Sequence, residues 1–521
     1  MSAEQTLVPH LDQAGIDTRP YSGVVNLPAL AIAAADWGPA AAVAKAQDWR
    51  WAGAWADADA QRMHLYALLA QGGEYLLLTA SAPLETPKFT SQTPHYPTAD
   101  RLERHARDLL GVVYSDHPDG RRWTRHQAWP ASRYPLHPAA GMPTPGRTPA
   151  DTSYPFSSLR GDGVFEIPVG PVHAGIIEPG HFRFHAAGET VLRLEERLGY
   201  THKGIEALAV GRDPAALLHL AARVSGDSAV THAWAAAQAM ERAVGATVSP
   251  RALALRGLLA ERERVANHIG DIGAICNDVG FAFAQVQTSR LRECWQRRNH
   301  EIFGHRLLMD TVVPGGVAHD LDTTQIATLR ADHAALRKAT EPLFDIFDDH
   351  PSLEDRLVTT GHLSADDARA LGCTGYVGKA SGQPFDVRHD APYAPYQGLV
   401  VEAPVQSEGD VAARVRVRMA EVGMSLDLMD HLLRNLPEGD IQVPWPNSPA
   451  AACGLGLLEG WRGETLAFVR FDTNGHIARY FPRDPSWFIW PALERLIHGN
   501  IVADFPVCNK SLNGSYAGVD L

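Results

Sequence analysis

Apolar residues recur at helical spacing through most of the second half of the chain. After Ser249-Pro250, leucine, valine and isoleucine residues follow every three or four positions as far as Ile272. Serine is a frequent N-cap, and proline fits the first helical position. The apolar residues would line one side of a helix, so the sequence predicts a long helix here. Similar patterns predict helices at about 286–308, 324–349 and 408–435.

Two shorter helices are predicted just before this long one. Asp213 can cap a helix whose first residue is Pro214, and the apolar pattern stalls near Gly226. A second helix is expected to begin after Asp227 or Ser228 and to end near residue 245.

Strand patterns flank this helical zone. Tyr75 to Leu78 form a short apolar run that predicts a buried strand. Residues 181–185 and 190–194 are strand-like and are separated by a turn, which indicates a hairpin. Near the C-terminus, turn signals at 460–463 and at Asn474-Gly475 predict a small antiparallel sheet.

These elements predict an α+β protein of two domains. Residues 1–138 mix short helical and strand-like runs, which favours a small α/β domain. Residues 139–162 are rich in Pro, Gly, Ser and Thr and read as a linker. Residues 163–521 are expected to form a helical-bundle domain that opens with a β-hairpin and includes a small antiparallel sheet near its C-terminus.

Composition narrows the class of protein. With 21% charged and 45% hydrophobic residues the chain is expected to be globular, and its net charge of −13 argues against non-specific nucleic-acid binding. Its five cysteines form no CxxC motif, so we expect no local zinc or iron–sulfur site. There is no GxxxxGK[ST] or GxGxxG nucleotide motif. The N-terminus lacks a secretory signal, and we expect membrane association to be peripheral, through partner subunits.

Several strings in the second domain carry a family resemblance. They are GPVHAGIIEPGHFRFHAAGETVLRLEERLGYTHKGIE at 170–206, RGLLAERERVANHIGDIGAICNDVG at 256–280, the block at 355–396 that includes GYVGKASGQPFDVRHDAPY, and EGWRGE at 459–464. The chain resembles the large subunit of membrane-bound, energy-converting (group 4) nickel–iron hydrogenases and the quinone-site subunit of respiratory complex I. Residues 90–123, with the string HPDxRR, resemble the small connecting-arm subunit of complex I.

The resemblance implies a nickel–iron site, but its ligands are missing. The family supplies four cysteines in two pairs, RxCGxC and DPCxxC. The corresponding positions here are Ser225, Ser228, Ser515 and Gly518. A serine hydroxyl is a hard donor that stays protonated at neutral pH, and glycine has no ligand atom. We therefore expect no metal centre in this chain and place it near hydrogenase-related complexes that lack the metal-binding cysteines.

The quinone site of complex I is altered as well. The resemblance implies that a histidine and a tyrosine hold the quinone head, and here Ile177 and Leu220 stand at those positions. Quinone binding therefore stays possible only at a remodelled site, and no cofactor bound by this chain is expected.

A polar frame around the former metal site is the candidate functional site. Carboxylates and histidines at such a site can pass protons when neighbouring charges tune their pKa values. The alternative is a structural role: Arg388 with Asp390 could form a salt bridge, and Glu178 could cap a turn. The charge run 261–264 is expected to be a solvated helix face. The candidates for proton transfer or coupling are His173, Glu178, Arg223, Asp227, His232, Asp278, Arg388 and Asp390.

Together these inferences predict a subunit of a membrane-associated respiratory oxidoreductase complex. It would lie on the cytoplasmic face of the cytoplasmic membrane and contact a small iron–sulfur subunit, which holds the cluster, and antiporter-like membrane subunits. It would couple electron transfer to proton or sodium translocation. Three alternatives remain open: an NADH/quinone-type oxidoreductase subunit with a remodelled quinone site, a non-catalytic scaffold, and a true hydrogenase with unusual metal ligands.

Overall fold

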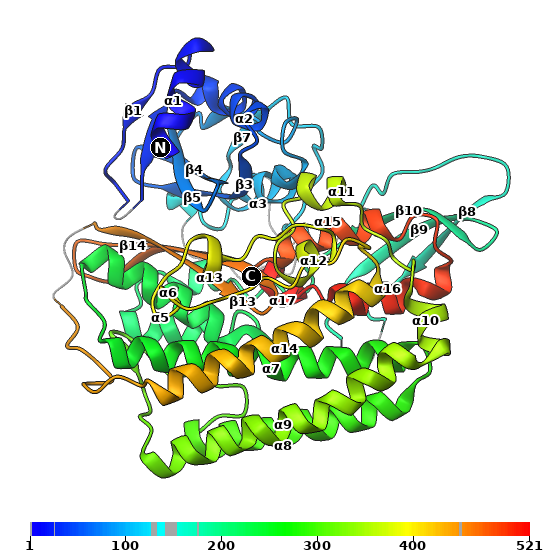
Figure 1. Cartoon of the computed structure of the whole chain (residues 1–521). Helices are drawn as coiled ribbons and strands as arrows, with labels where there is room; N and C mark the ends of the chain where they lie inside the picture. The colour runs from blue at the N-terminus through cyan, green and yellow to red at the C-terminus, as the bar shows by residue number, and fades with distance from the viewer. Residues whose placement is uncertain (1–2, 25–26, 127–132, 141–153, 174–176, 447–450) are drawn as a thin grey trace.

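The N-terminal part of the protein is a mixed sheet covered by helices (Figure 1). This computed structural model describes residues 3–24, 27–126, 133–140, 154–173, 177–446 and 451–521. The sheet has the order β1-β2-β5-β4-β3, in which β2 and β5 are parallel and β3, β4 and β5 antiparallel. The predicted strand at Tyr75–Leu78 is confirmed as part of β5. The elements are α1 (Ala3–Gln13), β1 (Arg19–Pro20), β2 (Ala29–Ile32), α2 (Trp37–Ala46), β3 (Arg50–Ala58), β4 (Arg62–Gln71), β5 (Glu74–Pro83), β6 (Lys88–Thr90), α3 (Asp100–Leu110) and β7 (Val113–Ser115).

A three-stranded antiparallel sheet follows and extends away from the rest of the molecule (Figure 1). The predicted hairpin is confirmed as β9 (His181–Ala187) and β10 (Thr190–Arg197). The sequence did not predict the third strand, β8 (Val164–Val169), which pairs with β9. Pro168 weakens its strand pattern, and β8 can accommodate this proline because it is an edge strand.

The predicted helices form the lower half of the molecule in Figure 1. The Asp213 side chain accepts a hydrogen bond from the Ala216 amide, and Ser249 Oγ accepts one from the Ala252 amide. Both predicted N-caps are therefore confirmed. The predicted helix at 286–308 begins earlier, at Ala282, and ends at Phe303, because Gly304 adopts a φ of +77°. The helices are α4 (Ile205–Ala209), α5 (Pro214–Ala221), α6 (Ala229–Val244), α7 (Pro250–Asp278), α8 (Ala282–Phe303), α9 (Thr323–Asp349) and α14 (Val411–Arg434).

The predicted C-terminal sheet is confirmed and packs directly on helix α6. Its strands are β13 (Cys453–Gly460), β14 (Gly463–Phe471) and β15 (Ile477–Arg483). A Cβ added at Gly456 would lie 2.0 Å from the carbonyl oxygen of Ala235, so only glycine permits this approach of strand to helix. The remaining elements are β11 (Val312–Val313), β12 (Gly316–Val317), α10 (Pro351–Leu357), α11 (Ala365–Ala370), α12 (Gly375–Ala380), α13 (Val387–Asp390), α15 (Ser486–Leu496), α16 (Phe505–Leu512) and α17 (Tyr516–Asp520).

The prediction of a solvated charge run at 261–264 is wrong. Glu261, Arg262, Glu263 and Arg264 are all buried, with at most 6% of their surface exposed. Helix α7 is surrounded by other helices, and each of these charges finds a polar partner there. Charge pattern alone could not show this, because the partners of Glu261, such as Arg388, come from distant segments.

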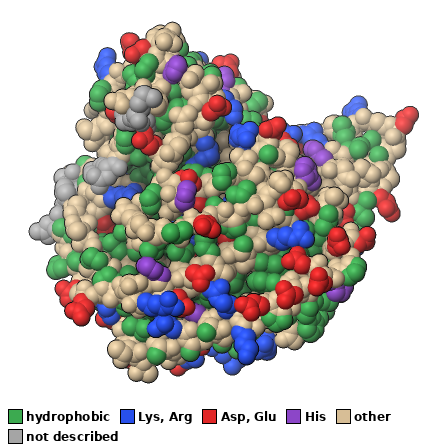
Figure 2. Space-filling model, in the orientation of Figure 1, with side chains coloured by type: hydrophobic (Ala, Val, Ile, Leu, Met, Phe, Trp, Pro, Cys, Tyr) green, Lys and Arg blue, Asp and Glu red, His purple; other side chains and the backbone are tan. Residues whose placement is uncertain are grey.

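In the parts of the chain that the structure describes, no helix combines the length and the apolar composition needed to cross a bilayer. In Figure 2 charged side chains of both signs are interspersed over the visible face, and a hollow separates the N-terminal lobe from the sheet of β8, β9 and β10.

Candidate functional site

The two segments that replace the cysteine pairs lie against each other. Ser225 precedes α6, and Ser515 is the N-cap of α17, 290 residues further along the chain. Their hydroxyl oxygens are 2.8 Å apart. Ser515 Oγ also accepts the amide hydrogen of Gly518, at 2.9 Å. The fold therefore brings the former ligand positions together, but a chain of hydrogen bonds links them.

Asp227 and Arg462 form an ion pair beside these serines. Arg462 Nη1 and Nη2 donate to the two carboxylate oxygens of Asp227 at 2.8 and 2.6 Å, and Ser225 Oγ donates to Oδ1 at 2.7 Å. Burial opposes ionisation of Asp227, but the Arg462 charge holds its pKa below the ordinary value. Arg462 Nη1 also donates to Ser228 Oγ, and its guanidinium lies over the ring of Trp461. Arg462 was not among the predicted site residues, although the family string EGWRGE at 459–464 contains it.

Gly518 borders a second polar group that the sequence did not link to the site. A Cβ added at Gly518 would lie 2.8 Å from Cγ of Asp484. Asp484 Oδ2 is 2.9 Å from His232 Nε2, and Asp484 Oδ1 accepts the Ser486 amide. Burial opposes ionisation of Asp484, but its hydrogen bond with His232 and the nearby charges of His232 and Arg462 together lower the pKa of this carboxyl. His232 is thus part of the site through Asp484.

A further carboxylate, Asp271 of α7, lies next to the C-terminal segment. Asn513 Nδ2 donates to both of its oxygens, at 2.9 and 3.0 Å, and the cations of Arg418 and Lys510 are 3.4 and 3.3 Å away. The sequence pattern predicted Asp278 as the residue of this helix in the frame. Asp278 is exposed at the end of α7, two helical turns further along, whereas Asp271 contacts the C-terminal segment of the site.

His173 and Glu178 contact the same C-terminal helix, α17. His173 Nε2 is 3.2 Å from the Tyr516 hydroxyl oxygen, and Glu178 Oε2 accepts the Ala517 amide at 2.9 Å. The Glu178 contact agrees with the capping role considered for it. The sequence did not predict a role for Tyr516, because the family's DPCxxC pattern assigns ligands only to positions 515 and 518.

Three other predicted residues lie outside this cluster. Arg223 pairs with Asp310, at 2.6 and 2.8 Å. Arg388 pairs with Asp386 and Glu261, not with Asp390 as the structural alternative supposed. Asp390 accepts the Asp386 amide instead. The sequence placed all three in the polar frame around the former metal site, but in the structure their side chains bind different partners.

The residues present do not fit a nickel–iron centre. The donors at the four positions are hydroxyls that already share hydrogen bonds, and Asp227 is committed to Arg462. Cys276, Cys373, Cys453 and Cys508 are mostly or fully buried, and burial raises the pKa of each thiol to about 12, so thiolates do not form near neutral pH. Across the described ranges no three histidine, cysteine or acidic residues form a group that could hold a metal ion.

Three protein families match successive parts of the chain. The family of the respiratory-chain NADH dehydrogenase 30 Kd subunit matches residues 31–143, that of nickel-dependent hydrogenase residues 203–270, and that of the respiratory-chain NADH dehydrogenase 49 Kd subunit residues 278–452.

Curated relatives span most of the length. Formate hydrogenlyase subunit 5 of Escherichia coli (strain K12) is 31% identical over 463 residues, which cover 87% of this chain and 81% of the relative. The C/D subunit of NADH-quinone oxidoreductase from Bacteroides fragilis is 28% identical over 468 residues, 86% and 88% of the two chains. A solved chain of the membrane-bound sulfane sulfur reductase, an archaeal respiratory membrane complex, aligns with a TM-score of 0.65 and 25% identity over 69% of this chain and 99% of that one.

Proposed function

The chain belongs to the family that contains formate hydrogenlyase subunit 5 and the C/D subunits of NADH-quinone oxidoreductase, and we propose that it serves a membrane-associated respiratory complex as a large subunit without a nickel–iron centre. The Asp227–Arg462 ion pair beside Ser225 and Ser515 carries this proposal. It puts a charged, hydrogen-bonded network where the family holds a metal.

In this proposal the chain couples two partners. A small iron–sulfur subunit brings electrons, and membrane subunits of the antiporter type move protons or sodium. The chain would lie on the cytoplasmic face, with residues 1–138 as the connecting-arm domain, 139–162 as a linker and 163–521 as the coupling domain. The likeness to a sulfane sulfur reductase chain, which comes from an archaeal respiratory membrane complex, supports a respiratory role.

Asp227 is the group through which this coupling would act. Its side chain is 33% exposed while that of Arg462 is 3% exposed, so water reaches the carboxylate but not the cation that holds it. The arrival of negative charge at a neighbouring cluster would weaken the attraction of Arg462 for Asp227 and raise the proton affinity of the network.

Metal analysis of the purified complex tests the absence of the centre. Because hard hydroxyl donors do not retain nickel, we expect less than about 0.1 nickel per chain after the protein is expressed with added nickel. One nickel per chain would refute the proposal.

Removing the Asp227 charge in the assembled complex tests the coupling role. We expect Asp227→Asn to lower ion uptake, driven by electron flow in inverted membrane vesicles, about tenfold or more. Asp310→Asn is the control, because it neutralises an aspartate that also pairs with an arginine, Arg223, but lies outside the cluster. Full ion uptake by Asp227→Asn would favour a non-catalytic scaffold.

One observation favours a remodelled quinone site as the second candidate. His173 and Tyr516 are 3.2 Å apart, so the two side-chain types that the family resemblance assigns to the quinone head occur together at other positions. Quinone binding that is lost in Tyr516→Phe would support this site. Binding unchanged by the substitution, or no binding, would exclude it.

A further inference from the structure

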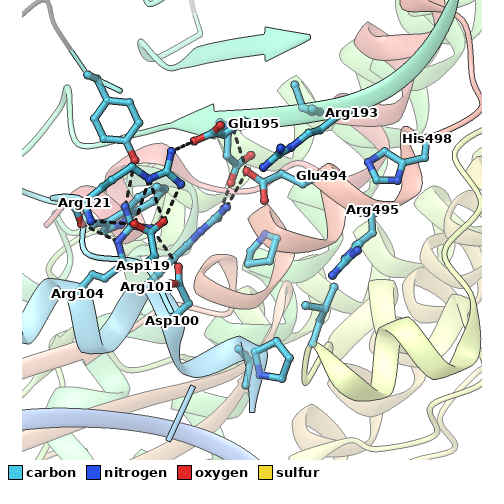
Figure 3. Close-up of a pocket in the computed structure, with 18 residues that line it drawn as sticks. Asp100, Arg101, Arg104, Asp119, Arg121, Arg193, Glu195, Glu494, Arg495 and His498 are labelled. Carbon is cyan, nitrogen blue, oxygen red and sulfur yellow. Dashed lines mark hydrogen bonds and ion pairs between the residues drawn. The ribbon is translucent and has the colours of Figure 1, made fainter. Parts of the chain in front are cut away.

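A cavity of about 300 Å³ lies between the N-terminal part and the second part of the chain. Helix α3, strand β10 and helix α15 supply most of its wall (Figure 3). None of the proposed coupling residues lines it. It is large enough for a small molecule with several polar groups.

The side chains on one side of the cavity are paired with one another in ion pairs. Arg121 pairs with Asp119 at 2.6 Å and also with Glu195, and Arg104 lies 3.1 Å from both Asp119 and Asp100. Figure 3 shows these side chains joined in one network. The two cations and their carboxylates largely neutralise one another within the wall, so this side needs no ligand.

The opposite side carries two arginine charges without such compensation, and burial and these charges lower the pKa of the neighbouring His498. Arg193 comes from β10, and Arg495 and His498 from the end of α15 and the turn after it. Within the described residues, these three side chains form no hydrogen bond or ion pair with a carboxylate. Figure 3 shows them grouped on one side of the space, beyond Glu494. Arginines that line a cavity without a protein partner are available to bind an acidic ligand.

Two buried polar atoms of the wall also lack a partner in the part of the chain described. They are Glu196 Oε2 and Thr98 Oγ1. Arg101 is the shared cation of two carboxylates. It pairs with Glu196 through Oε1, and its Nη2 lies 3.2 Å from Oε1 of Glu494. Burial outweighs the Arg101 charge and raises the pKa of Glu196 to about 8. A protonated Glu196 can donate a hydrogen bond from its free oxygen, and an acceptor in the cavity would satisfy it.

We propose that this cavity binds a small multivalent oxyanion, whose phosphate or carboxylate groups contact Arg193 and Arg495 and accept hydrogen bonds from Glu196 and Thr98. Guanidinium groups bind such oxyanions through paired N–H donors. The ligand contacts both parts of the chain and therefore stabilises the junction between them.

Titration calorimetry with two probes on the full chain tests the site. Pyrophosphate represents phosphate ligands and citrate carboxylate ligands, both at a constant ionic strength of about 0.15 M to limit long-range attraction. We expect one of them to bind with a stoichiometry of one, and the double variant Arg193→Gln/Arg495→Gln to bind it at least about tenfold more weakly. The probe that binds identifies the ligand class.

The control removes the same charge elsewhere. Arg290 of α8 and Arg330 of α9 are exposed, and the variant Arg290→Gln/Arg330→Gln has the same net charge as the test variant. It should bind the probe within about twofold of the unmodified chain. Equal weakening in both variants, or no saturable binding of either probe, would overturn the proposal. In the latter case the arginines would be free to bind an acidic surface of a partner protein.

Discussion

At the scale of single residues, one atom separates serine from cysteine and changes the chemistry of the site. Ser225 and Ser515 occupy the geometry of facing ligands, with oxygens 2.8 Å apart. Thiolates at this separation would repel each other without a metal between them, but hydroxyls share a proton and form a hydrogen bond. The hydrogen bond between Ser225 and Ser515 therefore stabilises this arrangement of the two segments without a metal ion.

Gly518 allows a test of how tightly this network is packed. Gly518→Ala places a methyl group 2.8 Å from Asp484 Cγ, which must move and weaken its contact with His232. We expect the free energy of unfolding to fall by about 1–3 kcal/mol, measured by urea denaturation. Gly423→Ala in α14, where a Cβ meets nothing within 4 Å, should be neutral or stabilising by up to about 1 kcal/mol. Similar effects of the two substitutions would contradict the packing argument.

At the scale of elements, helix α7 is held by charge as well as by apolar packing. Glu261 accepts from Arg388 at 2.9 Å, from Tyr396 at 2.7 Å and from Ser425 at 2.6 Å. Burial opposes its ionisation, but Arg388 and then Arg264 lower its pKa to about 2. These contacts tie α7 to α13, to α14 and to the loop at 391–399.

Neutralising Glu261 tests how much its buried charge contributes to the free energy of unfolding. Glu261→Gln leaves Arg388 and Arg264 undercompensated, and we expect a loss of about 3–5 kcal/mol in the free energy of unfolding at about pH 7. Because its folded pKa is depressed, the carboxylate contributes stability above about pH 4.5, and this is lost as pH falls toward 2. The variant should therefore lose less stability on acidification.

Glu301→Gln is the matched control on the exposed face of α8. Glu301 pairs with Arg298 at 2.5 Å, and its side chain is 66% exposed. A surface pair of this kind contributes about 1 kcal/mol or less. A loss from Glu261→Gln no larger than that from Glu301→Gln would show that the buried charges are dispensable.

At the scale of the whole molecule, buried ion pairs join the N-terminal part to the rest. Glu464 of β14 accepts from Arg50 of β3 at 2.6 Å and from Tyr75 of β5 at 2.6 Å, while Arg470 donates to Asp57 at 2.5 Å. Aromatic packing of Trp55 on Phe468, with ring centroids 5.2 Å apart, accompanies them. The two parts therefore share an interface that resembles a protein core.

The same interface makes stability depend on pH through Glu196. Its folded pKa of about 8 lies above the ordinary value of 4.5, so its protonated form favours folding. The contribution is complete below about pH 4.5 and is lost as pH rises through 8. We expect Glu196→Gln to reduce the fall in unfolding free energy between about pH 6 and 9, measured by urea titration.

Glu189→Gln, in the exposed turn between β9 and β10, should leave that pH dependence unchanged. If Glu196→Gln follows the unmodified protein over the whole pH range, Glu196 is ionised in the folded state. Its free oxygen would then be unable to donate to the proposed anion.

Most of the secondary structure was predictable because it depends on local signals. Asp213-Pro214 and Ser249-Pro250 start helices by contacts within one turn, and the residues at Asn474-Gly475 turn a hairpin regardless of what packs on it. Long-range partners were not predictable in this way. Arg388 was paired with its neighbour Asp390 on sequence grounds, but in the structure it bonds Glu261, 127 residues away.

The sequence by itself determined the family and the chemistry that the site has lost, because a ligand atom is a property of residue type. Serine at 225, 228 and 515 and glycine at 518 supply no thiolate in any fold. Only the tertiary structure decided what replaced it, namely the Asp227–Arg462 pair and the His232–Asp484 contact against Gly518, and only the tertiary structure placed Arg193 and Arg495 in one cavity. Charge interactions depend on distance and burial, and both are fixed only when remote segments pack together.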